Sequence, residues 1–313
     1  MRILIVGAGA VGSLLAARCA AVGDVVELTA RPDHAAAVRA RGVEVQGTSP
    51  GTFRPTALRG LADAHEPEAV VLAVKTFDLV RAVGELGRRF PRVVPTLLPQ
   101  NGLGVETIAE RSFRDAGVAD PGPFLVRAVN SVPVTLVGPG VVRQAGTGEI
   151  LLRDPALGGV AAGATALFVG LLGRAGLPVR LVPDLERELW RKALVNAAIN
   201  PVTALHQIPN GRLRESPYRE EATGLLREAQ RAAAADGFEF SDAEADEALQ
   251  RVVRATAENR SSMLQDRDRG RPTEVDAISG EIVRRARAHG VDLPRTRAVV
   301  ERLAARPSRT EAT

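Results

Sequence analysis

The sequence predicts an α/β protein whose first half is a doubly wound parallel sheet and whose second half is all-α. Apolar runs with the length of buried strands recur through the first 184 residues, between segments of helical character. From Leu185 onward these runs vanish, and helix-start signals replace them. A chain of 313 residues is long enough for two domains. We therefore expect a first domain at 1–184, an all-helical second domain at 185–305 and a disordered tail at 306–313.

The first strand leads directly into a glycine-rich turn. Residues 2–6 are an apolar strand followed by Gly7-Ala8-Gly9-Ala10-Val11-Gly12, and then come a helical stretch at 13–21 and a second strand at 25–28. In such a pattern the first glycine permits a tight turn, the second lets the backbone approach a pyrophosphate, and the third allows close packing of helix on strand. The six residues of the turn are thus predicted to bind a dinucleotide, in a Rossmann-type domain.

The end of the second strand bears on the choice of cofactor. It reads Thr29-Ala30-Arg31, where NAD enzymes usually place an acidic residue on the ribose. An arginine can instead pair with the 2′-phosphate of NADP through two hydrogen bonds. We therefore expect NADPH/NADP with Arg31 as a contact; the alternative is that Arg31 is a solvated loop residue.

Apolar runs at 69–74 and 93–98 continue the predicted sheet. Lys75 follows the first run and the turn Gln100-Asn101-Gly102 follows the second. Ligands of open α/β sheets bind at the carboxyl ends of the strands, so both positions are expected at the cofactor crevice. A plain turn role for Asn101 is the alternative. Short strands around 128–134 and 141–152 are then expected to close the sheet before an apolar helix at 160–173.

Only two lysines, Lys75 and Lys192, occur in the chain, so arginine supplies the other positive charges of the 41 Lys plus Arg. An ammonium group can be tuned to act as an acid or base, whereas a guanidinium does not release its proton. The two positions are therefore candidates for chemistry. Their alternative interpretation is that codon bias left them on the surface.

Helix signals order the second half. Ser241 and Glu244 form a capping box, Ser216 and Pro217 are expected at the N-cap and N1 positions of a helix, and a helix beginning at 273–276 is expected to stop at Gly290.

Polar side chains recur on one face of the first helix of this half. Lys192, Asn196 and Asn200 have i, i+4, i+8 spacing, which places an ammonium and two amides in a row. The row is either a solvated face or the wall of a pocket. Exposed helices of this chain carry Arg and Glu, so the asparagines favour the pocket. Further amide, hydroxyl and carboxylate candidates are Asn210, Asn259, Ser262 and Glu274. Ordinary alternatives are a turn role for Asn210, a helix-end role for Ser262 and a favourable charge at a helix start for Glu274.

The composition of the chain restricts the classes of partner that we expect. A formal charge of +4 and 3% aromatic residues argue against a nucleic-acid partner, and a mildly positive surface suits small anionic substrates. The single Cys19 excludes an internal disulfide and is interpreted as a core residue, and the four histidines lack the spacing of metal ligands. The apolar segments 3–17 and 156–173 contain too many glycines for a signal or membrane segment. We expect a cytoplasmic protein with no membrane or metal partner.

Several of these motifs, taken in order, resemble the ketopantoate reductase (2-dehydropantoate 2-reductase) family. They are the glycine turn, Lys75, Gln-Asn101-Gly, the segment 188–205 with Lys192, Pro-Asn210-Gly, and the segment 257–276 with Ser262 and Glu274. The resemblance covers nearly the whole chain. It implies that Lys192 is the proton donor, that Asn196, Asn200, Asn210 and Ser262 contact the substrate, and that Lys75, Asn101 and Glu274 serve the cofactor and its junction with the substrate.

The expected function is therefore NADPH-dependent reduction of ketopantoate, a 2-oxo acid, to pantoate in pantothenate and coenzyme A biosynthesis. One alternative is a related NADP-dependent reductase of another 2-oxo acid or an imine, and a second is a non-catalytic NADP-sensing protein. Asn101, at the junction with the cofactor, and Asn259, an amide in the segment of Ser262, are also expected to contact the substrate. A homodimer is left open.

Overall fold

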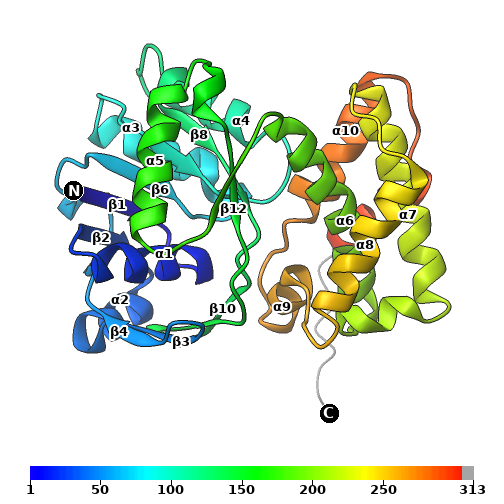
Figure 1. Cartoon of the computed structure of the whole chain (residues 1–313), viewed down its shortest axis with the longest axis horizontal. Coiled ribbons are helices and arrows are strands. Elements are labelled where there is room, and N and C mark those ends of the chain that lie inside the picture. Colours follow the sequence, from blue (N-terminus) through cyan, green and yellow to red (C-terminus); the bar gives the residue numbers. More distant parts are fainter. Residues whose placement is uncertain (305–313) are drawn as a thin grey trace. The chain divides into compact units, whose positions relative to one another are not determined.

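The structure is a computed structural model and describes residues 1–304, so the tail expected at 306–313 lies outside the described residues. The chain divides into two compact units (Figure 1). The first comprises Met1–Gln100 and Gly104–Leu185. The second comprises Asn101–Leu103 and the chain from Glu186 onward. Each unit is described by itself.

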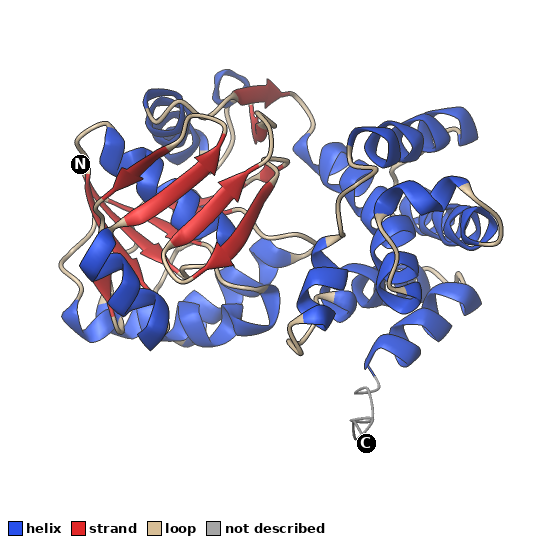
Figure 2. Ribbon diagram, turned by 90° about the horizontal axis from the view of Figure 1, so that it is seen from below, coloured by secondary structure: helices blue, strands red, loops and turns tan. Residues whose placement is uncertain are grey.

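A six-stranded sheet in which every neighbouring pair is parallel forms the centre of the first unit (Figure 2). Its order is β5-β2-β1-β6-β7-β8. Along the chain these are the third, second, first, fourth, fifth and sixth strands of the sheet, which is the order of doubly wound dinucleotide-binding folds. The predicted fold class is confirmed. The strands are β1 (Arg2–Val6), β2 (Val25–Thr29), β5 (Thr56–Leu58), β6 (Ala69–Leu72), β7 (Thr96–Leu98) and β8 (Leu125–Arg127).

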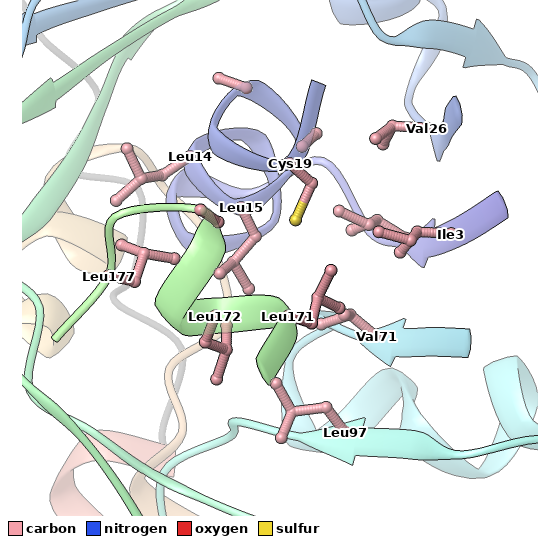
Figure 3. Packing of buried hydrophobic residues seen from close by; sticks show 14 of the residues in the cluster. Ile3, Leu14, Leu15, Cys19, Val26, Val71, Leu97, Leu171, Leu172 and Leu177 are labelled. Carbon is pink, nitrogen blue, oxygen red and sulfur yellow. The ribbon is translucent and has the colours of Figure 1, made fainter. Parts of the chain in front are cut away.

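Helices cover both faces of this sheet because alternate strand residues point to opposite sides. Ile3 and Ile5 pack with α1 (Ala10–Ala21) and α5 (Ala162–Arg174), whereas Leu4 and Val6 pack with α3 (Leu79–Arg89) and α4 (Val105–Asp115). Figure 3 shows the first of these two cores, with Cys19 among its aliphatic side chains. The interpretation of Cys19 as a core residue agrees with this burial. The other helices of the unit are α2 (Pro32–Arg41) and the short turns η1 (Leu61–Asp63), η2 (Thr76–Asp78), η3 (Gly122–Phe124) and η4 (Pro155–Leu157).

The expectation that the strands between 128 and 152 close the main sheet was wrong. They enter two further sheets, of order β10-β11-β3-β4 and β13-β12-β9. In the first, β11 runs parallel to β3, and the buried Val43, Val45 and Val142 join the core that contains α1. Alternation of apolar residues predicts a strand but not its partner, which the packing surface on α1 decides here. These strands are β3 (Val43–Gly47), β4 (Gly51–Phe53), β9 (Val129–Asn130), β10 (Val134–Gly138), β11 (Val141–Gln144), β12 (Ile150–Arg153) and β13 (Val179–Val182).

The described part of the second unit is helical throughout, as predicted. The Ser241 hydroxyl accepts the Glu244 N–H at 3.2 Å, which confirms the capping box. The last predicted helix also ends before Gly290, but it contains a π-helical turn, η6 (Asp276–Gly280). The elements are α6 (Leu185–His206), η5 (Asn210–Arg214), α7 (Tyr218–Ala235), α8 (Asp242–Ala255), α9 (Ser262–Asp268), η6, α10 (Glu281–Ala288) and α11 (Pro294–Ala304).

One helix start was predicted a residue too early. Pro217 occupies the N-cap position of α7 in place of Ser216, and the helix begins at Tyr218. Pro217 has ψ near 0°, outside the regular helical range, and is therefore not the first helical residue. In the part of the chain that the structure describes, none of the helices combines the length and apolarity needed to cross a membrane.

Candidate functional site

The glycine turn has the geometry that its sequence predicts. Gly7 has φ +106°, and a Cβ there would lie 2.9 Å from the carbonyl carbon of Ala73. A Cβ at Gly12 would lie 2.0 Å from the carbonyl oxygen of Gly7. These two glycines are therefore required by the fold of the first unit itself.

Gly9 differs from the other two glycines because nothing inside the protein requires it. It is exposed, its φ is −74°, and a Cβ would meet only the Ala73 carbonyl oxygen, at 4.0 Å. Gly9 is also the N-cap of α1, whose first turn has no side-chain cap and no acidic residue. The unpaired N–H groups of such a helix start bind anions. The turn thus fits the pyrophosphate of a dinucleotide, with open access to the backbone at Gly9.

Arg31 and Lys75 lie after strands on either side of β1. The Thr29 hydroxyl at the end of β2 accepts the Gly7 N–H at 3.1 Å, which ties this strand to the glycine turn. Arg31 is exposed and is the N-cap residue of α2, with Asp33 in the first turn of that helix. Lys75 is half-buried and follows β6, two residues after Ala73, against which Gly7 packs.

Two residues fix the end of β7: Arg127, which the sequence analysis does not single out, and Gln100, which it names only as part of the turn. Arg127 is buried and donates to the carbonyl oxygens of Leu98 at 2.7 Å and Gln100 at 2.8 Å. The Gln100 amide nitrogen donates to the carbonyl oxygen of Leu72 at 2.6 Å. The backbone is therefore held immediately before Asn101. An arginine at the end of a short apolar strand is the signal that could have indicated this role.

A buried tryptophan sets the rotation of α6. Trp190 is 0% exposed, and its indole N–H donates to Asp236 at 3.1 Å. Lys192 lies two residues later, about 200° around the helix axis. Burying Trp190 therefore turns Lys192 away from the core of the second unit, and Lys192 is half-buried.

Two arginines hold α6 against α8. Arg187 and Arg191 donate to the Glu244 carboxylate at 2.9 Å. Hydrogen bonding by Arg191, followed by that of Arg187, holds the pKa of Glu244 below its usual value. The N-terminal half of α6 is thus fixed from two directions.

The predicted row of polar side chains is most buried at its C-terminal end. Lys192 and Asn196 are half-buried, and Asn200 is only 4% exposed. A solvated helix face would expose all three side chains. The burial of the row therefore favours a polar pocket wall over the surface alternative.

The start of α9 is attached to the end of α6. Ser261 is the N-cap of α9, and its hydroxyl lies 2.7 Å from that of Thr203. Further along α9, Arg267 donates to the carbonyl oxygen of Ala204 at 3.0 Å. Ser262, the predicted contact, is exposed at the first position of α9. The structure thus places Ser262 beside the helix that carries Asn200.

Asn210 is joined to the segment before α9. Its backbone N–H donates to the carbonyl oxygen of Asn259 at 3.0 Å, and its side-chain nitrogen donates to the Thr256 hydroxyl at 2.9 Å. Within the described residues, its buried side-chain oxygen has no hydrogen-bond partner. Asn259 itself is exposed. Asn210 therefore acts as a turn residue and also lies next to Asn259, another candidate.

Asn101 and Glu274 belong to the same unit, although 172 residues separate them. Gly102 has φ +91°, and a Cβ there would lie 2.4 Å from the carbonyl oxygen of Ala277 in η6. Glu274, which is 6% exposed, precedes that π-helical turn. Single π turns are frequent at functional sites. The Asn-Gly turn therefore exists as such, and it also brings Asn101 to the segment of Glu274.

The candidates fall into two sets. The glycine turn, Arg31 and Lys75 lie in the first unit; the remaining candidates, Asn101, Lys192, Asn196, Asn200, Asn210, Asn259, Ser262 and Glu274, lie in the second.

Comparison with known proteins identifies the family. The family model described as ketopantoate reductase PanE/ApbA matches residues 3–156. The family model of the C-terminal part of ketopantoate reductase PanE/ApbA matches residues 184–306. A 2-dehydropantoate 2-reductase of Archaeoglobus fulgidus is 32% identical over 292 residues, which are 93% of this chain and 92% of the relative. The chain belongs to the ketopantoate reductase family. The resemblance inferred from the motifs is confirmed.

Solved structures agree with this assignment. A PanE/ApbA family ketopantoate reductase from Ralstonia eutropha JMP134 has a TM-score of 0.85 at 27% identity, covering 97% of both chains. A D-mandelate dehydrogenase with NADH and anilino(oxo)acetate has a TM-score of 0.86 at 22% identity, covering 98% of both. The second likeness concerns the fold alone.

Proposed function

We propose that the protein reduces 2-dehydropantoate to pantoate with NADPH, and that Lys192 is the proton donor. The observation that carries the proposal is the row of Lys192, Asn196 and Asn200, half-buried to buried on a helix whose rotation Trp190 fixes. The family membership of the chain supports the substrate, since the Archaeoglobus relative bears that enzyme's name. The reaction belongs to pantothenate biosynthesis, and we place it in the cytoplasm.

The residues divide the work between binding and proton transfer. When bound, the cofactor supplies a hydride to the C2 ketone. The ammonium of Lys192 protonates the oxygen that becomes an alkoxide, and its charge stabilises that oxygen beforehand. The amides of Asn196 and Asn200 can each donate and accept hydrogen bonds, which suits the orientation of a hydroxylated 2-oxo acid. The glycine turn holds the pyrophosphate, and Arg31 pairs with the 2′-phosphate.

The direct test follows the absorbance of NADPH with purified protein and ketopantoate. Substrate-dependent oxidation of NADPH is the expected result, with reactions lacking ketopantoate as the control. Binding of NADPH without any oxidation would instead favour the NADP-sensing alternative.

A reductase of another 2-oxo acid is the second candidate, since the fold is shared with a D-mandelate dehydrogenase. Steady-state rates on ketopantoate and ketoisovalerate separate the two, because a polar pocket discriminates against a substrate without the terminal hydroxyl. We expect a higher kcat/KM for ketopantoate. Equal values would contradict the assigned substrate.

The choice of NADPH over NADH is tested at Arg31. Loss of a charge-assisted contact to phosphate weakens binding by about ten- to a hundredfold. Arg31→Ala is therefore expected to raise the Kd of NADPH by that factor and to leave the Kd of NADH almost unchanged, both measured by fluorescence titration. Arg88→Ala, at an exposed position of α3, is the matched control. An equal loss for both cofactors would remove Arg31 from the 2′-phosphate site.

A further inference from the structure

We propose that the buried hydroxyl pair of Thr203 and Ser261 is a positioning device for the substrate site. It sets the start of α9, and with it Ser262, relative to Asn200 on α6. The inference rests on the proposed function, because Asn200 and Ser262 are the substrate contacts that it links. Neither Thr203 nor Ser261 belongs to the predicted site.

Both hydroxyls are removed from water and lie in direct contact. Thr203 is 0% exposed, Ser261 is 5% exposed, and their oxygens are 2.7 Å apart. Thr203 comes three residues after Asn200 on α6, and Ser261 directly precedes Ser262. The pair is therefore a direct bond between the two segments that carry these candidate contacts.

Counting protons assigns the direction of the bond. The Thr203 oxygen lies 2.8 Å from the Ile199 carbonyl oxygen and 3.1 Å from that of Asn200, so Thr203 donates its single proton to a carbonyl. The Ser261 oxygen accepts the Leu264 N–H at 3.2 Å. The Ser261 proton is then free to go to Thr203. Each hydroxyl thus both donates and accepts, which is the fully satisfied state of a buried pair.

Other contacts keep α9 attached when this bond is lost. Met263 is buried in a small apolar cluster with Ala204 and Val275, and Arg267 donates to the Ala204 carbonyl oxygen. These contacts lie beyond the first position of α9. Removing the Ser261 hydroxyl therefore leaves α9 docked but releases its first turn, where Ser262 lies. The effect is expected in substrate binding more than in folding.

The experiment measures steady-state kinetics of Ser261→Ala and Thr203→Val with NADPH and ketopantoate. A typical hydrogen bond corresponds to about a three- to tenfold change in an equilibrium. We expect KM for ketopantoate to rise by that factor in each variant, with the Kd of NADPH unchanged. Ser261→Thr keeps both the hydroxyl and a capping side chain, and is expected to restore KM to within about twofold of the original.

Ser241→Ala is the matched control. Ser241 caps α8 through the same kind of bond, but it is exposed and its hydroxyl is not bonded to another helix in any contact that the structure gives. Both alanine variants lose a cap, so both are expected to lower Tm, and Ser261→Ala by more because it also loses the buried bond to Thr203. Only Ser261→Ala is expected to raise KM. If KM rises equally in both variants, the effect is one of general stability and the inference fails.

The double variant tests whether the two hydroxyls act as one unit. Its KM is expected to be no higher than that of the worse single variant, because the bond between the two hydroxyls is lost in all three. If the two substitutions instead multiply the increase in KM, the inference is wrong.

Amide hydrogen exchange gives a readout that does not depend on turnover: Ser261→Ala should speed exchange over residues 259–264. A wild-type protein without ketopantoate activity refutes the proposed function, whereas unchanged exchange and KM refute the positioning role.

Discussion

At Lys192, charge and a transferable proton can be separated by substitution. Lys192→Ala removes both, whereas Lys192→Arg keeps the charge on a group that does not release its proton. A positioned general acid contributes about 10²–10⁴ in rate, so kcat is expected to fall by that range in both variants. The Kd of NADPH, measured by titration, should change little. Near-normal turnover in both variants would exclude Lys192 as the proton donor.

Substitutions at two positions of the glycine turn can separate an effect on folding from an effect on cofactor binding. A methyl group at Gly12 meets a backbone oxygen at 2.0 Å, whereas at Gly9 it meets nothing closer than 4.0 Å. Gly12→Ala is expected to lower the free energy of unfolding by about 3 kcal/mol or more. Gly9→Ala should leave it within about 1 kcal/mol, yet weaken binding of NADPH. Chemical denaturation measures the free energy of unfolding of both variants, and cofactor titration measures their binding of NADPH. Stable, normal binding by Gly9→Ala would show that the dinucleotide does not approach this residue.

Among the elements, those with local signals were predicted and those defined by distant partners were not. The strand, turn and helix at 2–21 and the cap at Ser241 depend on neighbouring residues, and all are present. The sheet β10-β11-β3-β4 joins segments about 90 residues apart, and nothing in a local pattern names such a partner. The same reason hides Ser261, whose importance depends on Thr203, 58 residues earlier.

The junction of α1, α2 and β11 should make stability depend on pH. His34 is buried, its Nε2 lies 3.1 Å from the Ser13 hydroxyl, and its Nδ1 accepts the Gly140 N–H at 3.3 Å. Nδ1 is thus an acceptor in the neutral ring, and protonation would place two hydrogens against each other. Burial lowers the pKa of His34 below its usual 6.5.

A lowered pKa fixes the direction of this pH effect. Below about pH 6.5 the unfolded histidine takes up a proton that the folded one does not, so falling pH favours unfolding. We expect the Tm of the wild type to fall more steeply than that of His34→Gln as pH decreases from 6.5, measured by thermal melts at matched ionic strength. Parallel slopes would contradict a neutral buried His34.

At the scale of the whole molecule, the chain passes between its units at more places than the sequence indicates. A single boundary after residue 184 was expected, and the structure has a division between Leu185 and Glu186. It also assigns Asn101–Leu103 to the second unit, although β7 and α4 on either side belong to the first. Apolar patterns indicate whole helices and strands, so they cannot predict that the three-residue excursion Asn101–Leu103 belongs to the other unit. Yet this excursion carries Asn101, which we expect to contact both the cofactor and the substrate.

The attachment of that excursion depends on Gly102 and can be tested against a glycine of the same conformation. Gly102 and Gly237 both have φ +91°, but a Cβ at Gly102 would lie 2.4 Å from the Ala277 carbonyl oxygen, whereas at Gly237 it would meet nothing within 4 Å. Gly237→Ala is expected to cost only the conformational term, about 1–2 kcal/mol. Gly102→Ala adds a steric conflict of about 1–3 kcal/mol. It should also lower kcat/KM, because Asn101 moves with the turn, and Gly237→Ala should not. Denaturation curves and steady-state kinetics of the two variants measure the difference. Equal stability losses with unchanged kinetics would mean that the close contact at Ala277 neither anchors the turn nor places Asn101.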